Sequence, residues 1–171
     1  VDLLLRTYNV PDGTLFVDGQ DVNAVSIHSV RDACAYVPQD NFLFSDTIAH
    51  NIGFGVDDAS QADIDRAAAL ADVRDNIVDF KDGYETVLGE RGVTVSGGEA
   101  QKIAIARALY KDAPFIVLDE PTAALDPVAE AEIYAKFNEI AGDKTAIYIS
   151  HRLSSCKFCD EIAVFDHGEV V

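Results

Sequence analysis

Two adjacent carboxylates, Asp119 and Glu120, directly follow the apolar run at residues 115–118. A short apolar run bounded by a proline and by acids is typical of a parallel strand that is covered on both faces. Open α/β sheets bind ligands at the carboxyl ends of such strands. Neighbouring side chains on a strand point in opposite directions, so the two acids should have different tasks. One could hold a hard cation such as Mg²⁺, and the other could orient an attacking water. The alternative is a solvated strand end.

A second candidate is the run Val-Ser-Gly-Gly-Glu-Ala-Gln at residues 95–101, which leads directly into a helical pattern. Gly97 and Gly98 allow a close approach of the backbone, and a helix N-terminus presents free N–H groups to an anion. The hydroxyl of Ser96 would add a donor. The alternative is an ordinary helix start with Ser96 as its N-cap.

Two further polar residues follow predicted strands. His151 comes soon after the buried strand expected at residues 145–149, and Gln39 comes soon after the strand expected at residues 33–37. Parallel strands end at one edge of a sheet, so both residues should lie at the edge that carries the two acids. Histidine can donate to a phosphate oxygen, and an amide oxygen can bind Mg²⁺ or hold a water. Each residue also has an ordinary structural alternative. His151 could be a half-buried histidine whose hydrogen bonds are made within the fold, and Gln39 could be a surface glutamine without a role.

The elements that position these residues follow from hydrophobic periodicity and turn signals. An α/β core is expected at residues 1–40 and 110–171, with a helical subdomain inserted at residues 41–109. The helices are expected at residues 47–51, 61–71, 74–80, 98–110 and 126–142, with the last turns of another at residues 2–8 and a capping box at Ser60 and Asp63. Hairpins are expected across Asp18-Gly19 and, between residues 161–165 and 169–171, across His167-Gly168.

The composition limits the class of partner. Thirteen Lys and Arg against 30 Asp and Glu give a net charge of −17. Such a chain is repelled by the phosphates of nucleic acids, so no nucleic-acid partner is expected. ATP remains open, because a local nest of backbone N–H groups can hold phosphate within an acidic protein. Three cysteines, an odd number, indicate a reducing compartment. Cys156 and Cys159 form a CxxC, which we interpret as two buried small residues on one helix face.

The ordered set of motifs resembles the nucleotide-binding domain of ABC (ATP-binding cassette) transporters, over essentially the whole chain. Gln39 matches the Q-loop, residues 96–99 the signature motif, residues 115–120 Walker B with its following Glu, residues 124–126 the D-loop and His151 the switch histidine. The resemblance implies a P-loop NTPase (RecA-like) α/β sheet with an inserted ABC helical subdomain.

The resemblance also implies ATP and Mg²⁺ as cofactors. Asp119 would hold Mg²⁺, and Gln39 would contact both Mg²⁺ and the attacking water. Glu120 would act as the general base or orient the water, and His151 would contact the γ-phosphate.

The remaining site residues are implied to act across a dimer. Ser96, Gly97, Gly98 and Glu99 would bind the nucleotide of a partner domain, and Asp126 would couple the two sites. Glu99 departs from the usual glutamine and brings an acid near phosphate, although it can also complement the helix N-terminus.

The phosphate cradle of the family, GxxxxGK[ST], has no match, because no lysine of the chain follows a glycine. In the family this loop lies just ahead of the helix that residues 1–8 resemble. We therefore expect that the N-terminal part of the domain, with Walker A, is missing. The fragment alone is not expected to hydrolyse ATP.

Two segments resemble exporters in particular: residues 86–92, before the signature, and residues 41–48, after the Q-loop. The aromatic rings of Phe42 and Phe44 would fit a groove for a coupling helix of a membrane domain; the alternative is that both belong to the core. The implied function is ATP hydrolysis that powers an exporter through dimerisation. The implied partners are a second nucleotide-binding domain, identical or paralogous, and a transmembrane domain, at the cytoplasmic face of the cell membrane. The alternatives are a soluble ABC-type ATPase and a non-enzymatic fragment that offers only its signature face.

Overall fold

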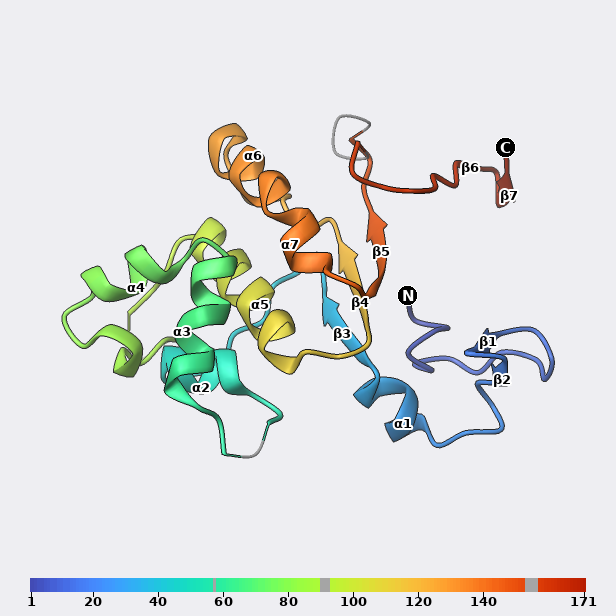
Figure 1. Cartoon of the computed structure of the whole chain (residues 1–171), viewed down its shortest axis with the longest axis horizontal. Helices are drawn as coiled ribbons and strands as arrows, with labels where there is room; N and C mark the ends of the chain where they lie inside the picture. The colour runs from blue at the N-terminus through green and yellow to red at the C-terminus, as the bar shows by residue number, and fades with distance from the viewer. Residues whose placement is uncertain (57, 90–92, 153–156) are drawn as a thin grey trace.

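A three-stranded parallel sheet lies at the centre of the structure (Figure 1). The structure is a computed structural model that describes residues 1–56, 58–89, 93–152 and 157–171. The strand order is β3-β4-β5, formed by Cys34–Val37, Phe115–Asp119 and Thr145–Ile149. Because both pairings are parallel, all three strands end at one edge of the sheet. The predicted α/β fold class is confirmed.

Strands β3 and β4 are buried, whereas β5 is largely exposed. Most residues of β3 and β4 are buried, as the apolar runs predicted. The prediction that β5 is a buried strand is wrong, since its first three residues are exposed and Ile147 retains 42% of its accessible surface. Both β3 and β5 are edge strands that pair only with β4, but helices α1 (Ile27–Asp32) and α5 (Gly97–Lys111) pack against β3, whereas Tyr148 is the residue of β5 that reaches the core.

In the described residues between β3 and β4, four helices form, and they gather to the left of the sheet in Figure 1. They are α2 (Ile48–Gly53), α3 (Gln61–Leu70), α4 (Arg74–Asp79) and α5 (Gly97–Lys111), with the 3-10 helix η1 (Gly83–Glu85) between α4 and α5. One hydrophobic core runs from Val37 and Leu118 of the sheet to Ile52 and Ile105 of the helices. The helices are therefore packed directly against the sheet. The division of the chain at residues 41 and 110 remains a prediction.

Two helical predictions need correction. The helix expected at residues 126–142 is two helices, α6 (Pro127–Ala135) and α7 (Phe137–Ala141), because α6 ends at the C-cap Lys136, whose φ of −89° and ψ of −4° open the regular helix. Helix α1 (Ile27–Asp32) was not predicted, because six residues are too few to show a period. It begins at Ser26, whose side chain accepts the N–H of His28.

Both predicted hairpins form, to the right of the sheet in Figure 1. Strands β1 (Phe16–Val17) and β2 (Gln20–Asp21) flank one turn, and β6 (Phe165–Asp166) and β7 (Glu169–Val170) flank the other. Each turn has two residues of positive φ, 51° and 72° in the first, 49° and 86° in the second. These are type I′ turns, which suit Asp-Gly and His-Gly pairs. The second hairpin is shorter than predicted.

The first residues form a single turn rather than the last turns of a regular helix. Thr7 N–H donates to the carbonyl of Asp2 at 2.8 Å and Arg6 N–H to that of Leu3 at 3.2 Å, with Arg6 at φ 53°. This is the Schellman pattern that ends helices. The capping box at Ser60 is wrong, because its side chain makes no cap bond.

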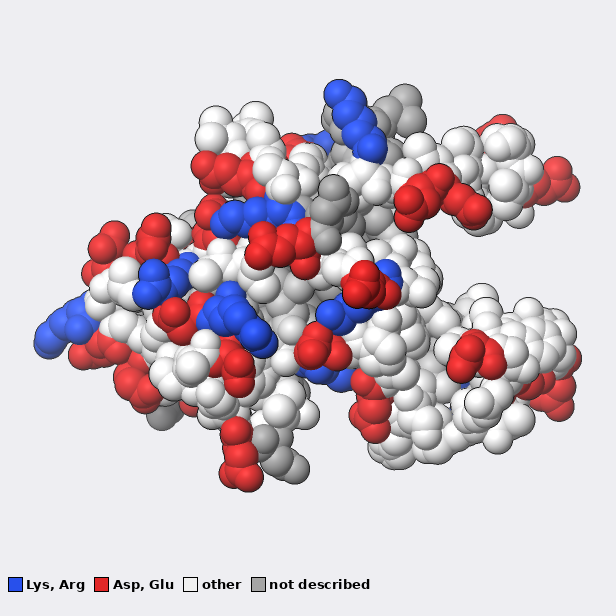
Figure 2. Space-filling view, viewed as in Figure 1, with Lys and Arg blue, Asp and Glu red and all other residues white. Residues whose placement is uncertain are grey.

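The cysteine interpretation is wrong for Cys159, which is half-buried and lies in no helix; Cys156, like residues 90–92 of the exporter-like segment, lies outside the described residues. Within the described ranges, no helix is both long and apolar enough to cross a bilayer. On the face that Figure 2 shows, acidic side chains cover more of the surface than basic ones, as the net charge leads us to expect.

Candidate functional site

The carboxyl ends of β3, β4 and β5 bring four of the predicted residues to one edge of the sheet. Gln39 lies two residues beyond β3, Asp119 ends β4, Glu120 follows it, and His151 lies two residues beyond β5. The predicted arrangement of strand ends is confirmed by the parallel register. The roles of these residues remain predictions.

Glu120 is held at three points. Its backbone N–H donates to the carbonyl of Ile149 at 3.0 Å, and its side-chain Oε1 accepts the backbone N–H of His151 at 2.8 Å. Its own carbonyl accepts a hydrogen bond from Gln101 Nε2 at 3.0 Å. These bonds support a backbone at φ 49°, a left-handed conformation that costs a non-glycine residue about 1 kcal/mol. The carboxylate is therefore rigidly placed where β4 ends.

The ring of His151 is free to meet a ligand. The His151 side chain is 94% exposed, and its Nε2 atom lies 3.8 Å from Oε1 of Glu120. The side chain of Glu120 is only 12% exposed. The pair thus combines a shielded carboxylate with an exposed imidazole, which suits a site where one group handles water and the other meets phosphate.

Asp119 lies beside Tyr36 on the same face of the sheet, since Tyr36 pairs with Val117 in the register. Burial, and then the Asp119 carboxylate, raise the pKa of Tyr36. No group of three or more His, Cys, Asp and Glu residues that could hold a metal occurs in the described part of the chain. Asp119 with the amide of Gln39 is instead a sparse oxygen donor set. Such a set fits Mg²⁺, which binds one or two carboxylates and completes its shell with water and phosphate oxygens.

The predicted signature residues begin α5. The Ser96 side chain accepts the N–H of Glu99 at 3.2 Å, and the Glu99 carboxylate accepts the N–H of Ser96 at 2.8 Å. This capping box is the helix-start alternative weighed for Ser96, and it shows Glu99 complementing the helix N-terminus. A Cβ atom added at Gly97 or Gly98 would stand 3.7 and 3.5 Å from atoms of Ala124. The glycines therefore lie against the turn that follows Glu120.

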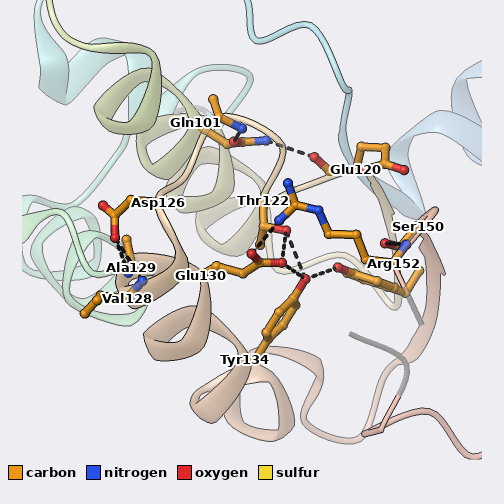
Figure 3. A network of polar contacts seen from close by, with 12 residues as sticks. Gln101, Glu120, Thr122, Asp126, Val128, Ala129, Glu130, Tyr134, Ser150 and Arg152 are labelled. Carbon is orange, nitrogen blue, oxygen red and sulfur yellow. Dashed lines mark hydrogen bonds and ion pairs between the residues drawn. The ribbon is translucent and has the colours of Figure 1, made fainter. Parts of the chain in front are cut away.

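Asp126 is the N-cap of α6. Its Oδ1 atom accepts the N–H groups of Val128 at 2.9 Å and Ala129 at 3.1 Å (Figure 3). These hydrogen bonds, that of Ala129 first, lower the pKa of Asp126. The side chain is accordingly used within its own chain, and its coupling role across a dimer remains a prediction.

Gln101 is a site residue that the sequence analysis missed. It is fully buried, at 0% exposure, on the second turn of α5. Its Nε2 donates to the carbonyl of Glu120, and its Oε1 accepts the N–H of Ala124 at 2.8 Å. The sequence could have indicated this role, because Gln101 lies on the same apolar helix face as Ala104, Ile105 and Ala108. A glutamine buried on such a face needs hydrogen-bond partners for its amide.

A second missed group links the segment after His151 to α6 (Figure 3). Arg152 NH1 donates to Glu130 Oε2 at 2.5 Å, and Glu130 Oε1 accepts the hydroxyl of Tyr134 at 2.6 Å. The hydroxyl of Thr122, on the turn after Glu120, donates to the same oxygen at 3.2 Å. The network thus ties the turns after β4 and β5 together through α6. No local pattern pointed to Arg152.

The aromatic residues after Gln39 were expected either to be exposed for a membrane domain or to belong to the core, and the structure divides them between the two. Phe42 is 64% exposed, whereas Phe44 is partly buried and stacks on Phe54 with centroids 4.2 Å apart. Arg107 lies 5.4 Å from the centre of the Phe44 ring. A surface hollow of about 530 Å³ adjoins this cluster, lined by residues between Thr47 and Ile64. One aromatic side chain is therefore free for a partner, and the other supports it.

Comparisons with known proteins agree with this geometry. The family model for ABC transporters matches residues 1–123. Similar curated proteins include an "ATM1-type heavy metal exporter" of Novosphingobium aromaticivorans, 45% identical over 168 residues, and "ATP-binding cassette sub-family B member 6" of Xenopus tropicalis, 44% identical over 171 residues. They cover 98% and 100% of this chain, which spans 28% and 20% of their lengths.

A solved structure is also similar: a bacterial Atm1-family ABC exporter with ATP bound matches with a TM-score of 0.93 and 44% identity. The match covers 99% of this chain and 30% of that one. With the family match over more than half of the chain, the conclusion is direct: the chain belongs to the ABC transporter family and has its ATPase fold.

Proposed function

We propose that this chain is the ATP-hydrolysing part of an ABC exporter, which works as a dimer of nucleotide-binding domains at the cytoplasmic face of a membrane. The observation that carries the proposal is the fixed carboxylate of Glu120 beside the exposed ring of His151, where the parallel strands end. The exporter names of the similar proteins support the class of function. Of the similar proteins reported above, one is named for its cargo, heavy metal, and the names of the others give none, so no cargo follows for this chain.

The proposed mechanism assigns one task to each residue. Mg²⁺, when bound, supplies positive charge to the phosphates, and Asp119 with Gln39 would hold it. The Glu120 hydrogen bond uses Oε1, so Oε2 is the oxygen that would orient the attacking water and take its proton. The exposed His151 ring would donate to a γ-phosphate oxygen. Catalysis of this kind depends on positioning and charge stabilisation, which explains why Glu120 is held so firmly.

The signature face would serve the second domain of the dimer. Ser96 and the two glycines begin α5, where backbone N–H groups and the helix dipole favour an anion. We propose that this end of α5 binds the γ-phosphate of nucleotide held by an identical or paralogous domain. Since the chain contains no GxxxxGK[ST] motif, we expect these 171 residues alone to bind ATP weakly and not to hydrolyse it.

The membrane partner would dock near Phe42. Its exposed ring, supported by Phe44 and Arg107, offers an apolar contact beside the hollow at residues 47–64. The site lies in the segment directly after Gln39, so docking there would bear on the proposed Mg²⁺ ligand.

The test is Glu120→Gln in the complete gene product that carries this chain. We expect ATP hydrolysis to fall about 100-fold or more, while ATP binding is retained, because the amide keeps the shape but not the basic oxygen. Glu132→Gln, on the exposed face of α6, is the matched control and should leave hydrolysis unchanged. Hydrolysis at the wild-type rate in Glu120→Gln would refute the proposed function.

A further inference from the structure

We propose that Gln101 is a positioning residue for Glu120: its buried side-chain amide connects the signature end of α5 to the catalytic turn of the same chain. The inference rests on the proposed function, since it takes Glu120 to be the group that orients water. It assigns a role to the last residue of the run at residues 95–101, beyond the residues 96–99 that match the signature motif.

The first support is the geometry of the amide. Gln101 Nε2 donates to the carbonyl of Glu120 at 3.0 Å (Figure 3). At the other end of the amide, Oε1 accepts the N–H of Ala124 at 2.8 Å. This one side chain is therefore hydrogen-bonded to the first and the last residue of the turn at residues 120–124. Full burial excludes water as a replacement partner, so the two bonds are the means by which this turn is joined to α5.

The second support is the conformation that the amide holds. Glu120 is a non-glycine residue at φ 49°, and such a residue persists only when its surroundings hold it. The sheet holds the amide of Glu120 through Ile149, and the segment after β5 holds its carboxylate through His151. The carbonyl of Glu120 accepts the N–H of Ala123 at 3.0 Å within the turn and Nε2 of Gln101 at 3.0 Å, and Gln101 is the partner that lies on α5.

The third support is the position of Gln101 on its helix. It lies five residues after Ser96, and a Cβ atom added at either glycine between them would stand 3.5 to 3.7 Å from Ala124 or Leu125, so little space separates this end of α5 from the turn. A shift of the α5 N-terminus relative to the sheet would therefore be felt directly at the carbonyl of Glu120. In this way the face that would bind one nucleotide is linked, within one chain, to the carboxylate that would hydrolyse another.

Two variants test the proposal in the complete gene product. Gln101→Met keeps the size of the side chain and removes both bonds, and Gln101→Glu keeps the acceptor for Ala124 while removing the donor to Glu120. A misplaced catalytic group costs about 10- to 100-fold in rate. We expect kcat for ATP hydrolysis to fall by at least about 10-fold in both variants, with KM and the ATP dissociation constant within about twofold of the wild type. Gln20→Met, at an exposed glutamine that begins β2, is the control for the same substitution.

Amide hydrogen exchange over residues 119–126 gives a readout that does not depend on activity. The N–H of Ala124 loses its acceptor in Gln101→Met and should exchange faster, while it stays protected in Gln101→Glu. A kcat within about twofold of the wild type in either folded variant would overturn the proposal. So would a loss of kcat that only matches the fraction of protein unfolded, because that is a structural effect alone. If Glu120→Gln itself remained active, the proposed function would fail instead, and the two failures are thereby distinguished.

Discussion

Arg107→Lys should weaken the attachment of the Phe42 segment to α5. The guanidinium group donates to the carbonyl of Asn51 at 2.7 Å, the carbonyl of Phe42 at 2.9 Å and Oδ1 of Asn51 at 2.9 Å. Burial lowers the pKa of Arg107, which marks the group as desolvated. A lysine keeps the charge but not the planar fork, so it can replace only one of the three bonds.

The expected loss follows from the bonds that remain unmade. Two charge-assisted hydrogen bonds at about 1.5 kcal/mol each give a loss of about 3 kcal/mol in the free energy of unfolding. In a chain of this length that lowers Tm by about 6–12 °C. A domain of ordinary stability, about 5–15 kcal/mol, would still fold. Urea unfolding followed by circular dichroism measures the change as a shift in the midpoint at constant slope.

The matched control is Arg66→Lys on α3. Arg66 pairs with Asp63 at 3.5 Å and its side chain is 75% exposed. The same substitution there should change the unfolding free energy by less than about 0.5 kcal/mol. Equal midpoint shifts in the two variants would refute the reasoning, because the fork at Arg107 would then contribute no more than a surface charge.

Four further outcomes are expected. Cys34 should resist alkylation by iodoacetamide at pH 7 until the chain is unfolded, because burial raises its pKa to about 11; reaction of the native thiol at the rate of a free cysteine would contradict this. Asp72→Asn should lower stability by about 1 kcal/mol at pH 7. Burial raises the pKa of Asp72, but the hydrogen bonds from Lys102 and Lys136 outweigh burial and lower it overall. The difference in unfolding free energy between Asp72→Asn and the wild type should therefore be full above the ordinary pKa of 3.8 and shrink as pH falls through the lowered value. Equal differences at pH 3 and pH 7, measured by urea titration, would refute this. Glu130→Gln should lower kcat for ATP hydrolysis more than it raises KM, because the ion pair between Glu130 and Arg152 positions the neighbouring residue His151. An unchanged kcat would show that the ion pair is only structural. Phe42→Ala should leave the unfolding midpoint of the chain unchanged while weakening co-purification with the proposed membrane domain, and intact co-purification would place the docking contact elsewhere.

Turn chemistry was the most predictable level of the fold. Asp18-Gly19 and His167-Gly168 specify type I′ turns by residues that tolerate positive φ, and the structure has both. The sequence predicted equally well the strands β3 and β4, from their apolar runs, and the capped start of α5. Each of these features depends on a few consecutive residues. The edge at which Gln39, Asp119 and His151 gather followed from the same local patterns and the general rule for parallel sheets.

Other features depend on which segments become neighbours. The apolar run of β5 resembles that of β4, yet β5 is exposed; the other edge strand, β3, is buried because helices α1 and α5 pack against it. Periodicity predicted one helix after Asp126, but the chain breaks at Lys136. The sequence likewise offered two alternatives for Phe42 and Phe44, and packing against Phe54 and Arg107 separated them.

The sequence by itself determined the α/β class, the order of the motifs and the identity of the residues at the strand ends. Those properties are local, or follow from strand direction alone. Only the tertiary structure decided how Glu120 is held, because its partners Gln101 and His151 are 19 and 31 residues away. A hydrogen bond at that separation leaves no period in the sequence. It depends on the packing of α5 and β5 against the end of β4, which is decided when the core forms.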